Sequence, residues 1–192
     1  MSRIARVLRT LRTHLDLRCR ACSVCHTADV DPLASVGTHL AEDDSMKRAD
    51  LPLLLASDMV GSSRGRFPLD PVRMQKAIFL LTQRGSDTWQ DLYTYRPYNW
   101  GPYSGQLSVD LDVLQATDQL VAEPFPGSQY GTFRATPLAE KRVREAWAAC
   151  SQPEQSFLRT VRAYVTSKSF NALLREVYAA YPQYASKSLF NG

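Results

Sequence analysis

A helix and the turn that precedes it are both encoded in YNWGPYSGQLSVDLDVL, residues 98–114. Gly101-Pro102 predicts a turn, because glycine and proline are the strongest local breaks in regular structure. Ser104 follows and can cap a helix, since its hydroxyl accepts a hydrogen bond from an amide of the first turn. The next apolar residues fall at i, i+4 and i+7, which predicts a helix that buries Leu107, Leu111 and Leu114.

The charges on this expected helix bear on its function. A helix that reads DNA bases carries Arg, Lys, Asn or Gln at exposed positions near its N-terminus. Between Ser104 and Asp118 there is no Lys or Arg, whereas Asp110, Asp112 and Asp118 are acidic. DNA phosphates would repel these carboxylates. We therefore predict that Asp110 and Asp112 lie on a solvated acidic face that does not read bases.

The aromatic residues beside the turn have two interpretations. Trp100 and Tyr103, together with Tyr93, Tyr95 and Tyr98, could fill a core while the turn redirects the chain. Alternatively, the turn presents the helix to a partner, and Trp100 and Tyr103 belong to the contact surface, since aromatic residues often anchor interfaces. The residues alone leave both interpretations open.

Other elements are predicted on both sides of this stretch. Start signals with a capping side chain close to a proline occur at Asp50, Asp70 and Thr136. Apolar spacing then predicts helices over 53–60, 71–85, 137–149, 154–166 and 170–180. Segments 119–123 and 130–135 predict a two-stranded hairpin with a loose tip.

The resulting order of helix, helix, turn, helix, hairpin and helix is that of a winged helix, with the hairpin as the wing. We predict a mainly α fold with a small β-hairpin. Residues 49–150 form the winged-helix-like domain, and residues 151–192 are C-terminal helices that extend the same domain. Residues 1–48 are predicted to be a basic appendage and linker, because Arg is frequent at their start and periodicity is weak after Ala28.

The appendage contains the candidate metal ligands. Cys19, Cys22 and Cys25 could bind zinc or part of an iron–sulfur site together with His26 or His39. The second pair of ligands that a structural zinc site needs is missing, so we predict no metal and no cofactor. The alternatives for this segment are a membrane-surface helix, a disordered basic tail, or sequence upstream of a true start at Met46.

Composition narrows the class of protein. The chain has 192 residues, 44% of them hydrophobic, and a formal net charge of +4, which gives no strong indication of nucleic-acid binding. No apolar run approaches the ~20 residues of a membrane span. All three histidines lie before residue 40, so the main domain lacks the commonest general base. We therefore expect a cytoplasmic protein that is not an enzyme.

Several motifs resemble one family. MQKAIFLL (74–81), YNWGPYS (98–104), LDVL with QLV (111–121) and FRATPLAEK (133–141) are similar to the Panacea domain of SocA-like antitoxins. The resemblance covers roughly 51–149, and the Gly-Pro-Tyr-Ser turn is its most distinctive part. It transfers to Gly101, Pro102, Tyr103 and Ser104 as the signature turn, with Trp100 beside it. Family members more often have glycine where this chain has Asp118-Gln119.

The resemblance implies an antitoxin that binds and neutralises a neighbouring toxin directly, or an adaptor that delivers the toxin to a protease. The expected contact surface is the signature turn together with Asp110 and Asp112. The alternative is a DNA-binding transcriptional regulator of the same fold. Its displaced DNA surface would use the basic residues of the helix after the hairpin, Lys141, Arg142 and Arg144.

Overall fold

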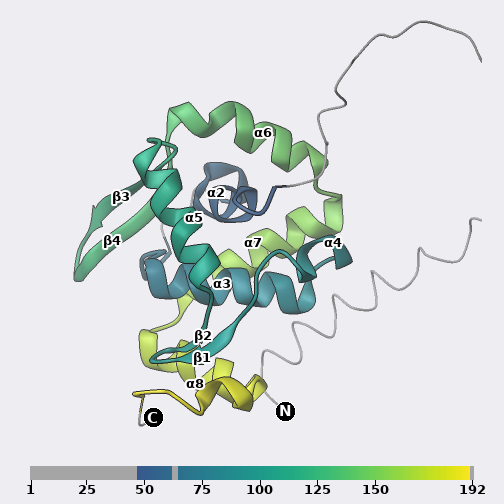
Figure 1. The fold of residues 1–192 in the computed structure, drawn as a ribbon. Helices are drawn as coiled ribbons and strands as arrows, with labels where there is room; N and C mark the ends of the chain where they lie inside the picture. Colours follow the sequence, from purple (N-terminus) through teal and green to yellow (C-terminus); the bar gives the residue numbers. More distant parts are fainter. Residues whose placement is uncertain (1–46, 62–64, 191–192) are drawn as a thin grey trace, which may run out of the picture.

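The computed structural model describes residues 47–61 and 65–190, and within them the chain is mainly helical (Figure 1). The α-helices are α2 (Asp50–Ala56), α3 (Pro71–Arg84), α4 (Asp87–Gln90), α5 (Gly105–Ala116), α6 (Glu140–Ala149), α7 (Gln152–Ser167) and α8 (Phe170–Ala180). Short 3-10 turns occur at η1 (Asp58–Val60), η2 (Pro137–Ala139) and η3 (Pro182–Ala185). Two antiparallel hairpins complete the fold, β1 (Arg96–Tyr98) with β2 (Gly101–Tyr103), and β3 (Leu120–Phe125) with β4 (Ser128–Ala135). The predicted mainly α class with a small β-hairpin is confirmed.

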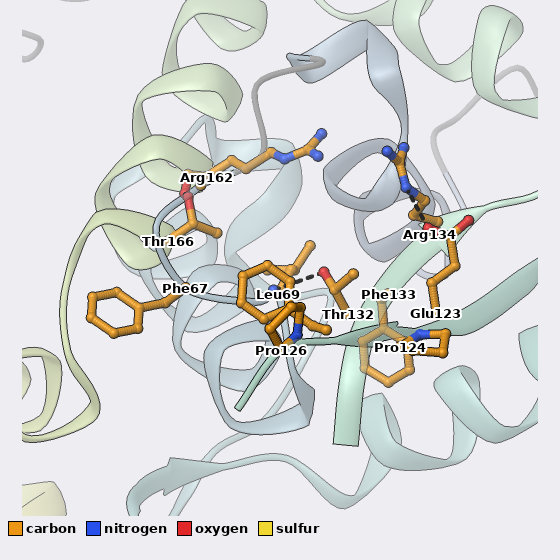
Figure 2. Close-up of a pocket in the computed structure, with 12 residues that line it drawn as sticks. Phe67, Leu69, Glu123, Pro124, Pro126, Thr132, Phe133, Arg134, Arg162 and Thr166 are labelled. Atoms are coloured by element: carbon orange, nitrogen blue, oxygen red, sulfur yellow. Dashed lines mark hydrogen bonds and ion pairs between the residues drawn. The ribbon is translucent and has the colours of Figure 1, made fainter. Parts of the chain in front are cut away.

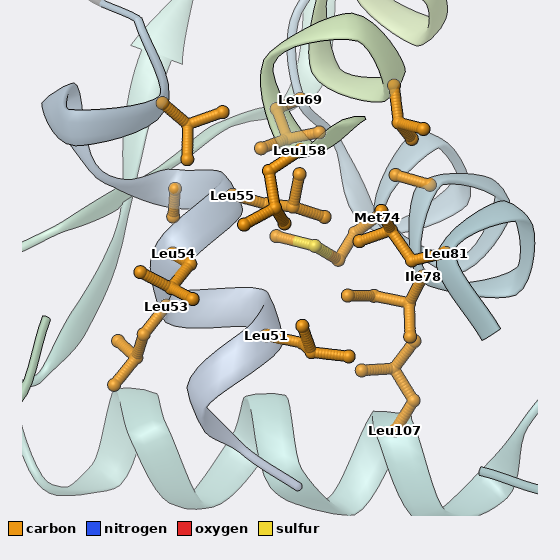
Figure 3. Close-up of a cluster of buried hydrophobic side chains, with 14 of the residues drawn as sticks. Leu51, Leu53, Leu54, Leu55, Leu69, Met74, Ile78, Leu81, Leu107 and Leu158 are labelled. Carbon is orange, nitrogen blue, oxygen red and sulfur yellow. The ribbon is translucent and has the colours of Figure 1, made fainter. Parts of the chain in front are cut away.

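Helix α2 lies at the centre of the core, with α3, α5, α6 and α7 around it (Figure 1). Every residue of α2 is buried, which is expected for a helix that is apolar on all sides. Its leucines meet Met74 and Ile78 of α3, Leu107 of α5 and Leu158 of α7 in one cluster (Figure 3). Helix α7 therefore belongs to the same core as the elements before it.

The capping prediction for α3 is confirmed. Asp70 accepts a hydrogen bond from the amide of Arg73, and Pro71 occupies the first turn, where no donor is needed. Asp50 and Thr136 act differently from the prediction. Asp50 lies inside the first turn of α2 and pairs with Arg142, while the Thr136 hydroxyl donates to the carbonyl oxygen of Asp118.

The second hairpin is more compact than predicted. Strand β3 runs to Phe125 and β4 begins at Ser128, so only Pro126 and Gly127 remain at the tip. Gly127 has a φ of 76°, a conformation that glycine adopts without steric penalty. A register irregularity between Glu123 and Phe125 accommodates Pro124, which has no amide hydrogen to donate.

The first hairpin corrects the predicted position of the signature turn. Gly101 and Pro102 lie in strand β2, and the chain turns two positions earlier, at Asn99 and Trp100. In Figure 1 this hairpin lies beside α8, and the C-terminal segment passes near it. The backbone amide of Leu189 donates to the carbonyl oxygen of Asn99 at 2.9 Å, which ties the two segments together.

The expectations about a membrane span and about the appendage can be compared with the structure only within the described residues. None of the helices in 47–61 and 65–190 is long and apolar enough to cross a membrane. The predictions for the appendage, including Cys19, Cys22, Cys25 and His39, fall outside the described residues, apart from its last two, Lys47 and Arg48.

Candidate partner-binding site

Strand β2 and the start of α5 are fixed by two polar side chains of α3. The Gln75 amide accepts from the backbone amide of Ser104 and donates to the Ser104 carbonyl oxygen, both at 2.9 Å. The Lys76 ammonium donates to the carbonyl oxygen of Pro102 at 2.9 Å. The Ser104 hydroxyl caps α5 by accepting from the amide of Leu107, as predicted. The two quoted motifs MQKAIFLL and GPYS therefore form one hydrogen-bonded unit.

Lys76 is a buried lysine with one hydrogen-bond acceptor among the described residues. Burial lowers the pKa of its ammonium to about 7, and the charge of Asp70 opposes this shift. The sequence analysis assigned no role to Gln75 and Lys76. The feature that could have identified them is that two polar residues follow Met74 directly and precede the apolar run 77–81.

Gly101 is required where β2 meets α8. Its φ of 92° lies in the left-handed region, and a Cβ atom there would come within 2.8 Å of the Tyr178 ring. The glycine of the signature turn thus allows close packing against α8.

The structure corrects the predicted role of Asp110. Its carboxylate is buried and forms two 2.7 Å hydrogen bonds with the Arg48 guanidinium and one of 2.8 Å from the Tyr93 hydroxyl. Arg48 also lies over the Tyr93 ring. Asp110 therefore stabilises the interior and is not on a solvated face. Asp112 is two positions further along the helix and therefore points in a different direction, so Asp112 is exposed while Asp110 is buried.

The outward face of α5 is apolar with one acid. Val109 is 58% exposed and Val113 is 53% exposed, and they lie one turn apart with the exposed Asp112 between them. None of the described residues forms an ion pair with Asp112. The side-chain carbonyl oxygen of Gln106 accepts hydrogen bonds from the amide and hydroxyl of Thr94, which ties Gln106 to the segment before β1. We define Val109, Asp112 and Val113 as the α5 surface.

The end of α5 explains the unusual Asp118. The amide of Asp118 donates to Gln115 and the amide of Gln119 donates to Leu114, which is the pattern of a Schellman cap. Asp118 adopts a φ of 54°, in the conformation that glycine most often supplies at this position. The family glycine and this aspartate can therefore serve the same backbone geometry.

The aromatic residues near the turn are partly core and partly surface. Tyr93 is buried, whereas Trp100 is 37% exposed and meets the edge of the Phe170 ring. The rings of Tyr98 and Tyr103 lie 4.9 Å apart, and the Arg96 guanidinium is near both. The core interpretation thus applies to Tyr93, and the contact-surface interpretation of Trp100 and Tyr103 stays a prediction.

The three candidate DNA-binding residues of α6 all have carboxylate partners. Arg142 binds Asp50, Lys141 lies 3.7 Å from Glu145, and Arg144 pairs with Glu140. Arg142 also donates to the Gln119 side chain, which fixes it against the domain. Their positive charges are therefore largely offset, so this helix offers little excess charge to phosphates.

The remaining candidates for chemistry among the described residues are metal-ligating side chains and one cysteine. Within 47–61 and 65–190, no group of three or more His, Cys, Asp or Glu side chains is arranged to hold a metal ion. Cys150 is buried and donates to the carbonyl oxygen of Ala146. Burial raises the pKa of its thiol to about 12, so the nucleophilic thiolate is scarce at neutral pH.

A pocket of about 140 Å³ opens beside the second hairpin (Figure 2). Its walls come from the segment before α3, from both strands of the hairpin, and from α7. The segment contributes Phe67 and Leu69, and α7 contributes Arg162 and Thr166. Sequence reasoning missed this pocket, because its residues are scattered over about 100 positions without a motif.

The chain matches no protein-family model, and no curated protein or solved structure is significantly similar to it. The function must therefore be argued from the site.

Proposed function

We propose that this chain is an antitoxin-like protein that binds a toxin directly and neutralises it, or delivers it to a protease. The α5 surface is the contact region. The observation that carries the proposal is the pair of exposed valines on a rigidly held helix that has no Lys or Arg. An apolar face with an unpaired carboxylate suits a protein partner that is basic at its site.

The arrangement around α5 supports presentation of this surface. Gln75 and Lys76 fix the start of the helix, and the Arg48–Asp110 pair fixes its middle. Partner binding then requires little ordering of α5, which leaves more of the contact energy for affinity. We also propose that the domain has the winged-helix arrangement. In that arrangement α5 corresponds to the helix that a DNA-binding winged-helix protein places in the major groove.

The test is co-expression of the full chain with the product of the adjacent gene. The double variant Asp112→Lys/Val113→Arg should lose co-purification and rescue of growth, because it reverses the charge and removes the apolar contact. Loss of a central interface contact commonly weakens binding by about 2 kcal/mol, or roughly thirtyfold. Both positions are exposed, so the circular dichroism spectrum should stay unchanged.

A matched control makes the same types of change elsewhere. Asp87→Lys with Met59→Arg alters one exposed acid and one exposed apolar residue outside α5 and should retain full rescue. If the α5 variant folds and still rescues growth, the α5 surface does not hold the toxin.

A further inference from the structure

The pocket beside the second hairpin has a mixed lining of apolar side chains and polar groups, with two arginines on one side. Leu69 and Pro126 lie together in Figure 2 with Pro124 to their right, and the guanidinium groups of Arg162 and Arg134 lie above them. The ring of Phe67 points away from the hairpin, toward Arg66 and Arg73. None of the lining residues belongs to α5, so the pocket is separate from the α5 surface.

The two arginines differ in their partners. Arg134 is neutralised by Glu123 at 2.9 Å and by Asp58 at 3.0 Å. Arg162 donates to the carbonyl oxygen of Ser57, and none of the described carboxylates forms an ion pair with it. Burial lowers the pKa of Arg162. The negative charge of Asp58 raises that pKa, and the positive charge of Arg134 lowers it further. Arg162 is thus a partly desolvated cation that feels the charge of Asp58 but has no direct ion-pair partner among the described residues.

The pocket size restricts the occupant. An engineered protein cavity of about 150 Å³ holds one benzene molecule, whereas pockets that enclose free drug-sized ligands span about 300–1,000 Å³. The volume of about 140 Å³ therefore accommodates one apolar side chain. Only the last residue of a polypeptide carries both an apolar side chain and a main-chain carboxylate.

We infer that this pocket binds the C-terminal residue of a partner polypeptide, with an apolar side chain against Pro124 and Pro126 of the hairpin and the carboxylate on Arg162. Charge complementarity favours this occupant, because a carboxylate supplies the direct ion-pair partner that Arg162 lacks among the described residues and forms charge-assisted hydrogen bonds. Arg134 stays paired with Glu123 and Asp58 and contributes mainly to the wall. The inference does not depend on the proposed function, since a chain end could be read whether or not α5 binds a toxin.

The test uses the full chain and defined peptides. Acetyl-Gly-Gly-Leu and acetyl-Gly-Gly-Phe with free C-termini are titrated against ¹⁵N-labelled protein, and each is compared with its C-terminal amide. The free acids should give saturable shifts at the amides of Thr132, Phe133 and Thr166. The C-terminal amides should bind at least tenfold more weakly, because the charge-assisted bond is lost.

Variants on α7 provide the matched comparison. Arg162→Gln should lose at least tenfold in affinity for the free acids, and Arg162→Lys should lose less because it keeps the charge. Arg159→Gln, at an exposed position one turn away, should bind like the unchanged chain.

Three results would overturn the inference: equal binding of acid and amide, unchanged binding by Arg162→Gln, or N-acetyl-leucine binding as tightly as the tripeptide. The last would assign the pocket to a free small acid. If Arg162→Gln does not fold, the acid–amide comparison on the unchanged chain decides the question.

Discussion

Replacing Gln75 by Met should destabilise the whole domain, although the two side chains have similar length. The change leaves the amide of Ser104 without an acceptor at a position that is 1% exposed, where water cannot replace the lost bond. The Ser104 carbonyl oxygen keeps only the 3.3 Å contact from the amide of Ser108. An orphaned buried donor costs about 1–3 kcal/mol, and the weakened acceptor adds about 1 kcal/mol. We expect a total loss of about 3 kcal/mol.

The loss is measured by urea unfolding followed by circular dichroism at 222 nm. For a chain of this size, about 3 kcal/mol corresponds to a fall in the thermal midpoint of about 6–12 °C. Gln83→Met is the matched control, because Gln83 is exposed on the same helix and its replacement should change stability by less than about 0.5 kcal/mol. If the two variants unfold at the same urea concentration with the same slope, the hydrogen bonds of Gln75 do not hold the turn.

Two further predictions concern the same unit. The pKa of Lys76 is about 7 in the folded chain, which is below its ordinary value of about 10.4. Between about pH 7 and about pH 10 the unfolded chain therefore binds more protons than the folded chain. The free energy of unfolding rises with pH in that window for this reason. Relative to Lys76→Met, the unchanged chain should gain about 2 kcal/mol from about pH 7.5 to about pH 9.5 in urea unfolding. Parallel pH profiles of the two proteins would contradict the lowered pKa of Lys76. Gly101→Ala should lose about 1–3 kcal/mol through its left-handed φ and its contact with Tyr178, whereas Gly105→Ala, with nothing within 4 Å, should be neutral or stabilising. Equal thermal midpoints for the two alanine variants would contradict this.

The features that could be predicted from the sequence are local ones. The start of α3 is encoded by Asp70 and Pro71, and the start of α5 by Ser104, each within one turn of the helix. The second hairpin was recognisable from two strand-like segments, 119–123 and 130–135, on either side of a stretch that contains Pro126 and Gly127. The winged-helix arrangement stays a prediction, because it depends on how these elements pack and not on their order alone.

The features that could not be predicted depend on contacts across the chain. Asp110 lies 62 positions from Arg48, so its spacing on α5 gave no sign of a buried ion pair. The same limit applies to Gln75 and Ser104, which are 29 positions apart. Periodicity places a residue on one side of a helix, but it does not say which polar residue finds a partner inside.

Because Asp110 is buried, it is not a suitable position for testing partner binding by charge reversal on α5. Reversing its charge would break an interior pair, and removal of one partner from such a pair commonly costs about 3–5 kcal/mol; the half-exposed Arg48 would recover part of that by hydration. A loss of partner binding on changing Asp110 would therefore report unfolding as readily as contact. Among the described residues, Asp112 carries the same charge two positions later without an ion-pair partner, so charge reversal at Asp112 can separate recognition from stability.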